Sequence, residues 1–134
     1  MRYSAYIAAI AVVFSVSPAV SDEPGAEVFQ QYCATCHGSD ARGGGPLSEY
    51  MTDAIPDLTK LSARNPKAEG QFPMLDIIHI IDGRTGLRAH GGPMPVYGAI
   101  FAEEGANREN WGQVMYTRGK IMSLVYYLES IQEE

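Results

Sequence analysis

Two cysteines and a histidine stand close together near the start of the chain, in the run Cys33-Ala34-Thr35-Cys36-His37. They are the only cysteines among the 134 residues. A C-x-x-C-H run is the attachment signature of c-type haem. Thiols about one helical turn apart match the two vinyl groups of one porphyrin, and the histidine then lies under the ring, where it binds iron. The motif predicts one covalent haem c on Cys33 and Cys36, with His37 as an iron ligand.

Two other kinds of site use paired cysteines. A thioredoxin-type C-x-x-C site needs no following histidine and usually lies in an α/β pattern, which this sequence lacks. A structural zinc site needs four ligands, and only two further histidines, His79 and His90, are present to complete one. Haem attachment is therefore the interpretation that the motif favours.

An iron bound by one histidine either takes a sixth ligand or keeps an open position. Met94 lies between Pro93 and Pro95, which stiffen the segment that presents its sulfur. His90 shares this loop and is the competing ligand, whereas His79 lies in an apolar segment, where a core histidine is the commoner outcome. We expect His37 and Met94 to bind the metal, and His90 or an open site are the alternatives.

The sixth ligand decides what the site can do. Two protein ligands close the iron to substrate, but an electron still crosses the exposed edge of the porphyrin. Methionine favours iron(II) and raises the reduction potential relative to two histidines. An open position would instead permit peroxide or gas chemistry.

The first 21 residues have the layout of a secretory signal peptide. Arg2 makes the start basic, residues 5–16 are apolar, and Ala19 and Ser21 are the small residues that a signal peptidase requires. The apolar run is short for a transmembrane span, and an uncleaved anchor is the competing interpretation. We expect residues 1–21 to be a cleaved signal peptide that directs the protein to a bacterial periplasm, and residues 22–134 to form a single domain.

The chain is acidic, with a formal net charge of −6 at pH 7. This charge argues against nucleic acid or an anionic lipid surface as the partner. It is compatible with a basic redox partner protein. Membrane attachment is expected only if residues 1–21 are retained as an anchor.

Hydrophobic spacing predicts three main helices. The first runs from about Gly25 into the cysteine motif, with Ser21 or Asp22 as its N-cap. The second covers residues 73–83, because a proline suits its first turn and a glycine its end. The third spans about residues 115–131, where apolar residues recur at helical spacing.

The remaining segments are predicted to be short turns and loops. One or two helical turns are expected over residues 47–52 and again over residues 56–61. Residues 84–110 are rich in glycine and proline and are predicted to be a loop. The sequence therefore predicts an all-α domain.

The chain resembles the class I c-type cytochromes, which are small soluble monohaem proteins, over most of residues 22–134. Gly25-x-x-x-Phe29 looks like part of the family's N-terminal helix, in which a glycine permits close crossing by the C-terminal helix. Residues 124–128 are similar to that closing helix, and Tyr127 is the better match for the aromatic that meets the glycine.

Two loop segments extend the resemblance. Gly45-Pro46-Leu47 looks like the stretch whose proline carbonyl accepts the hydrogen bond of the proximal histidine, which would orient His37. Met94-Pro95-Val96-Tyr97 resembles the distal methionine segment with its following aromatic. The resemblance implies a cytochrome c fold of helices and long loops around one haem. The lysine-rich ring of mitochondrial carriers is absent. Bacterial periplasmic members are the closer likeness, on the segments Asp82-Gly83-Arg84 and His90-Gly91-Gly92-Pro93-Met94-Pro95.

Four other side chains are candidates for contacts with the haem. Arg84 is expected either to pair with a propionate or to be a solvated loop arginine. Trp111 has an indole N–H that could reach a propionate, although a structural aromatic is the commoner outcome. Tyr50 and Tyr97 are candidates for the haem wall, and ordinary core packing would give the same sequence pattern.

These features favour a periplasmic electron carrier that moves single electrons between redox partner proteins and has no enzyme activity of its own. One alternative is a fixed cytochrome c subunit of a larger oxidoreductase or oxidase complex, which would have the same haem site. The other is an open-site haem peroxidase or sensor.

Overall fold

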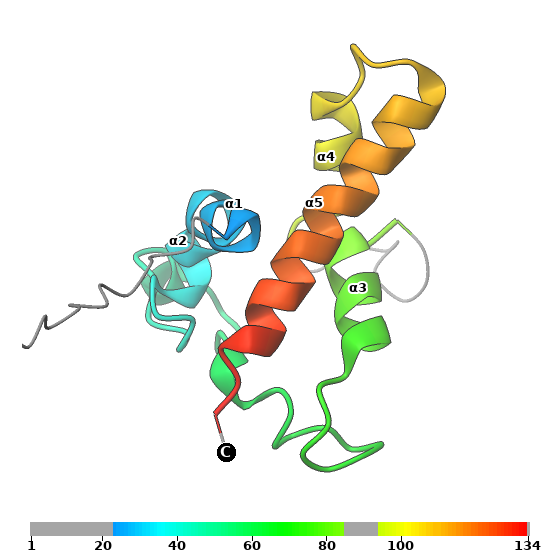
Figure 1. Ribbon diagram of the computed structural model, residues 1–134. Coiled ribbons are helices and arrows are strands. Elements are labelled where there is room, and N and C mark those ends of the chain that lie inside the picture. Colours follow the sequence, from blue (N-terminus) through cyan, green and yellow to red (C-terminus); the bar gives the residue numbers. More distant parts are fainter. Residues whose placement is uncertain (1–22, 85–93, 134) are drawn as a thin grey trace, which may run out of the picture.

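The computed structural model describes residues 23–84 and 94–133 (Figure 1). The predicted signal peptide and His90 lie outside these residues. The helices are α1 (Pro24–Tyr32), α2 (Ala34–His37), α3 (Met74–Asp82), α4 (Tyr97–Glu104) and α5 (Asn110–Ser130), with two short 3-10 helices, η1 (Ser48–Tyr50) and η2 (Leu58–Lys60). The described residues contain no β-strand, which confirms the all-α prediction.

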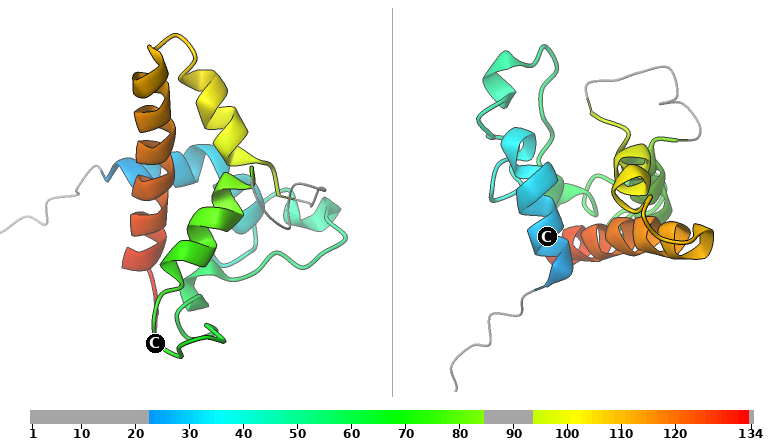
Figure 2. Two further views of the ribbon diagram at one scale, coloured as in Figure 1. Left: turned by 90° about the vertical axis from the view of Figure 1, so that its right-hand side faces the viewer. Right: turned by 90° about the horizontal axis from the view of Figure 1, so that it is seen from above.

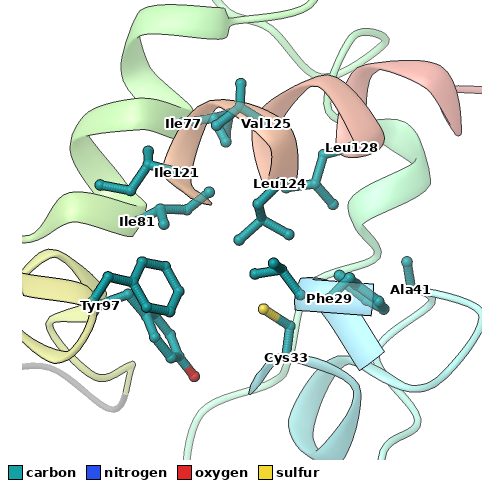
Figure 3. Close-up of a cluster of buried hydrophobic side chains, with 12 residues drawn as sticks. Phe29, Cys33, Ala41, Ile77, Ile81, Tyr97, Ile121, Leu124, Val125 and Leu128 are labelled. Atoms are coloured by element: carbon teal, nitrogen blue, oxygen red, sulfur yellow. The ribbon is translucent and has the colours of Figure 1, made fainter. Parts of the chain in front are cut away.

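The long helix α5 is the element on which the other helices assemble. Helix α1 crosses its C-terminal half, while α4 packs beside its N-terminal half and α3 lies against both α4 and α5 (Figures 1 and 2). Although α5 has 21 residues, no helix in the described part of the chain is long and apolar enough to cross a membrane. Buried side chains from α1, α3, α4 and α5 meet in one core (Figure 3).

The crossing of α1 over α5 depends on Gly25. A β-carbon at this position would overlap the backbone carbonyl of Ser123 and the Cβ atom of Tyr127. One turn later, the ring of Phe29 packs on Tyr127, with the two ring centroids 5.4 Å apart. The glycine therefore permits the close approach, and Tyr127 is the aromatic that meets it, as the resemblance implied.

The boundaries of α1 and α3 follow local rules. The N-cap of α1 is Glu23, rather than Ser21 or Asp22, and Pro24 takes the first helical position, where a missing N–H needs no partner. Helix α3 ends at Gly83, which has a φ of 64° and donates its N–H to the His79 carbonyl. Glycine adopts this left-handed conformation without steric cost.

The prediction of a continuous loop over residues 84–110 is wrong, because α4 lies within it. Glycines and prolines on both sides dominate the sequence signal there, yet Pro95 precedes the helix and residues 99–104 include good helix formers. Helix α5 also begins at Asn110 rather than at Met115, and it includes Gly112 in its first turn. A fourth substantial helix therefore joins the three that the sequence predicts.

After α5 the chain returns to the loop around η2. The Gln132 side chain donates a hydrogen bond to the Leu58 carbonyl at 2.8 Å and accepts one from the Ser62 N–H at 2.9 Å. The Glu133 N–H donates to the Thr59 carbonyl at 2.8 Å. These bonds fasten η2 and the residues just after it to the segment that follows α5.

We expect Gly25→Ala to lower the free energy of unfolding by about 1–3 kcal/mol, because the added methyl overpacks the helix crossing. Chemical denaturation followed by far-UV circular dichroism measures this change. The matched control is Gly119→Ala, since a β-carbon there meets no atom within 4 Å. That control should gain about 0.5–1 kcal/mol from the better helix former, and equal effects of the two substitutions would contradict the role of Gly25.

Candidate functional site

A largely apolar cavity of about 210 Å³ lies within the described structure. Its wall comes from segments far apart in the sequence, namely α1, α2, the loop before η2, α3, the start of α4 and the second half of α5. Cys33, Cys36, His37 and Met94 all line it. The structure therefore brings together the four residues predicted to attach haem and bind its iron.

The two cysteines lie one helical turn apart at the junction of α1 and α2. The Cys33 N–H donates to the Phe29 carbonyl at 2.8 Å, and the Cys33 carbonyl accepts from the His37 N–H at 2.9 Å. Figure 3 shows the Cys33 sulfur directed toward the middle of the buried cluster. Burial, and then the neighbouring Cys36 thiol, raise the pKa of the free Cys33 thiol to about 12.

A glycine-rich turn holds the backbone of α2. The N–H groups of Gly43, Gly45 and Leu47 donate to the carbonyls of His37, Cys36 and Thr35 at 2.7, 3.2 and 2.9 Å. A β-carbon at Gly45 would overlap the backbone of α2, so only glycine allows this approach. The turn thus satisfies carbonyls at the end of α2 that have no partner within the helix.

The side chain of His37 lies beside Pro56. Its Nδ1 atom is buried, and no atom of the described residues meets hydrogen-bond geometry with it. Burial lowers the pKa of His37, and the Pro56 carbonyl, an acceptor beside the ring, partly offsets this effect. Both Pro46 and Pro56 are exposed, but Pro56 lines the cavity, whereas Pro46 borders a separate hollow.

Pro46 therefore lies outside the cavity that His37 lines, and Pro56 is the proline whose carbonyl lies beside the His37 ring. The N–H groups on either side of Pro46, those of Gly45 and Leu47, are hydrogen-bonded to carbonyls of α2. These bonds hold Pro46 outside the cavity. Pro56 reaches the site because the Leu58 N–H donates to the Ala41 carbonyl at 2.8 Å, which fastens the start of η2 to the loop that follows α2.

Tyr97, the first residue of α4, packs in the core and also forms part of the cavity wall. It is only 7% exposed, and its hydroxyl donates to the Tyr32 carbonyl at 2.6 Å. Burial, and then the Cys33 and Cys36 thiols, raise the pKa of Tyr97 to about 12. Met94, three residues earlier, is half-buried on the same wall.

The other sequence candidates lie off the cavity wall. Tyr50 is 80% exposed, and Trp111 is 78% exposed in the first turn of α5, so neither packs in the core. His79 is exposed on α3 rather than buried in the core. The Arg84 guanidinium pairs with Asp82 through bonds of 2.6 and 2.9 Å, so its pairing with a propionate stays a prediction.

Sequence reasoning missed three parts of the wall. Pro56 is one of several loop prolines, and its distance from His37 along the chain gives no signal. Tyr32 directly precedes the first cysteine of the motif, and that adjacency is a signal that could have identified it. Ile77 and Ile81 of α3 line the cavity as well as the core.

The family model for cytochrome c matches residues 23–131 of the chain. Neither the curated proteins nor the solved structures gave a match. Members of that family bind haem c, and the cavity fits this group. Two thiols one turn apart, a histidine and a thioether all border an apolar space, and a carbonyl stands beside the histidine ring to orient it.

We expect a pH effect on stability from Tyr97. Its pKa in the fold is about 12, against 10.0 for an ordinary tyrosine. The neutral hydroxyl therefore stabilises the fold fully below about pH 10, and this contribution is lost as the pH rises toward 12, by about 1.4 kcal/mol per pH unit. Urea denaturation of the wild type and Tyr97→Phe over this range should show the steeper decline in the wild type only. Parallel curves would show that Tyr97 does not titrate with a raised pKa.

Proposed function

We propose that this chain, which belongs to the cytochrome c family, carries single electrons between redox partner proteins in the periplasm through an iron bound by His37 and Met94. The observation that carries the proposal is the shared cavity wall. Met94 comes from a distant part of the sequence, yet it lines the same apolar space as the complete cysteine motif. Membership of the cytochrome c family by itself supports haem-based electron transfer.

Covalent attachment is the role proposed for Cys33 and Cys36. Each thiol would add its sulfur and its hydrogen across one vinyl group, so that a thioether forms and no atom is lost. The hydrogen bonds that the glycine-rich turn makes to α2 hold this helix in place, and with it both sulfurs and the His37 backbone.

Orientation of His37 is the role proposed for Pro56. A hydrogen bond from the ring to this carbonyl would fix the tautomer and leave the other ring nitrogen for the metal. Because the Pro56 segment is bonded to Ala41 and fastened to the segment that follows α5, the acceptor is held from two sides.

Exchange of one electron is the chemistry that the haem supplies when it is bound. The thioether of Met94 is a soft ligand that favours the reduced state. If His37 and Met94 both bound the iron, no position would be left for a substrate, and a carrier would then be favoured over a peroxidase or sensor. The apolar wall keeps water away from the site, and the acidic surface favours a basic redox partner.

A fixed subunit of a larger redox complex is the second candidate function. Exposed apolar side chains at the beginning of α5 favour it, and these are Trp111, Val114 and Met115, at 78, 38 and 62% exposure. Purification of the native protein distinguishes the two candidates, because a carrier is isolated alone whereas a subunit is isolated with its partner.

The visible spectrum of the oxidised protein tests the ligand assignment. We expect a weak near-red sulfur-to-iron band in the wild type and its loss in Met94→Ala, with a lower reduction potential. Met115→Ala, which changes an exposed methionine on α5, is the matched control and should keep the band. A wild type without the band, or a band that survives in Met94→Ala, would exclude Met94 as the ligand.

We expect a Cys33→Ala, Cys36→Ala double variant to lack a cooperative melt by circular dichroism. The domain is small, so apolar contacts with the porphyrin form a large part of its core. The wild-type holoprotein gives the reference transition. A native-like, cooperative melt of the double variant would contradict this expectation.

A further inference from the structure

We propose that Lys120 and Glu104 are positioning residues that hold α4, and through it Met94, against the haem-binding end of α1. The inference rests on the proposed function in one respect, which is that Met94 is the sixth ligand. Both residues lie outside the cavity wall, and neither belongs to the cysteine motif or to the methionine loop.

The ion pair joins three helices at one point. The Lys120 ammonium on α5 donates to Oε2 of Glu104, the last residue of α4, at 2.6 Å. It also donates to the Tyr32 hydroxyl on α1 at 3.2 Å. The same hydroxyl donates to the other Glu104 oxygen, Oε1, at 2.5 Å. The lysine and glutamate side chains are only 16% and 30% exposed, so this is a partly desolvated pair.

Three aromatic rings lie close to the same ammonium group. The Lys120 Nζ atom lies 4.5 Å from the ring centroids of both Tyr32 and Phe101, and 5.6 Å from that of Tyr116. The Tyr116 hydroxyl donates to Glu104 at 3.2 Å. The rings come from α1, α4 and α5, so cation–π attraction adds to the same three-helix junction.

Tyr32 connects this junction to the cavity. It lines the cavity and directly precedes Cys33. Its ring packs edge-on against the rings of Phe101 and Tyr97, at 5.2 and 6.1 Å between centroids, and its carbonyl accepts the Tyr97 hydroxyl. Both ends of α4 are therefore fastened to the same residue of α1, at Tyr97 and at Glu104.

Met94 depends on α4 because it lies three residues before the first residue of this helix. If the Glu104 end loosens, α4 keeps only the contacts of Tyr97 and Phe101 with α1, and the methionine sulfur is fixed less well. Replacing Lys120 also leaves the partly buried Glu104 carboxylate without its cation, which disfavours the native placement of α4. An external ligand for the iron would then compete more successfully with Met94.

Imidazole titration of the oxidised holoprotein, followed by its visible spectrum, measures that competition. Apparent imidazole affinity rises in proportion to the fraction of molecules in which Met94 is displaced. We expect Lys120→Met to bind imidazole about tenfold more tightly than the wild type, which corresponds to about 1.4 kcal/mol. Lys120→Arg keeps the charge and the ring contacts, and should restore an affinity within about twofold of the wild type.

The matched control is Lys67→Met, which removes a more exposed ion pair. Lys67 Nζ lies 2.7 Å from Asp76 Oδ1, with side chains 71% and 42% exposed, and neither residue lines the cavity. Imidazole affinity of this control should equal that of the wild type. If Lys120→Met does not fold, Glu104→Gln provides the same test, with tighter imidazole binding again expected.

Two results have distinct meanings. An unchanged imidazole affinity in Lys120→Met, with the near-red band present in the wild type, overturns the positioning role, even if the thermal midpoint falls. Absence of that band from the wild type overturns the assignment of Met94 itself, and with it the premise of this inference.

Discussion

The close crossing of α1 over α5 is the contact on which the rest of the structure depends. A single missing side chain, at Gly25, lets the backbone of Ser123 and the β-carbon of Tyr127 approach α1 directly. The crossing fixes the direction in which α1 delivers Cys33 to the cavity. It also fixes the position of α5, whose Leu124 and Leu128 line that cavity. The attachment motif and the opposite wall are thus set by one contact.

The site combines an apolar wall with a few polar groups that have defined places. The Tyr97 hydroxyl is bonded to the Tyr32 carbonyl, and the Pro56 carbonyl stands beside the His37 ring. Low polarity strengthens each of these interactions, because little water competes with them. The protein therefore controls the iron environment through burial and a small number of fixed dipoles, which are the means by which a chain tunes a haem.

Sequence patterns predict those parts of this protein that depend on local rules. The spacing within Cys33–His37 and the apolar periodicity of α1, α3 and α5 are read from neighbouring residues, and the structure contains all of these helices. The sequence does not predict helix α4, because the prolines and glycines that flank it indicate a loop. The helix packs against α3 and α5, and these tertiary contacts cannot be read from neighbouring residues. The roles of Pro46 and Pro56 depend on which loop folds back to His37, and that choice is made by tertiary contacts alone.

The pairing of α1 with α5 also has a consequence for the order of events during biogenesis. These partners come from opposite ends of the described chain, so their contact is highly non-local and cannot form until α5 has been synthesised. The cysteine motif, in contrast, lies early in the sequence and emerges long before its enclosing wall exists. Its thiols are therefore accessible while the chain is still open, before the folded core buries Cys33.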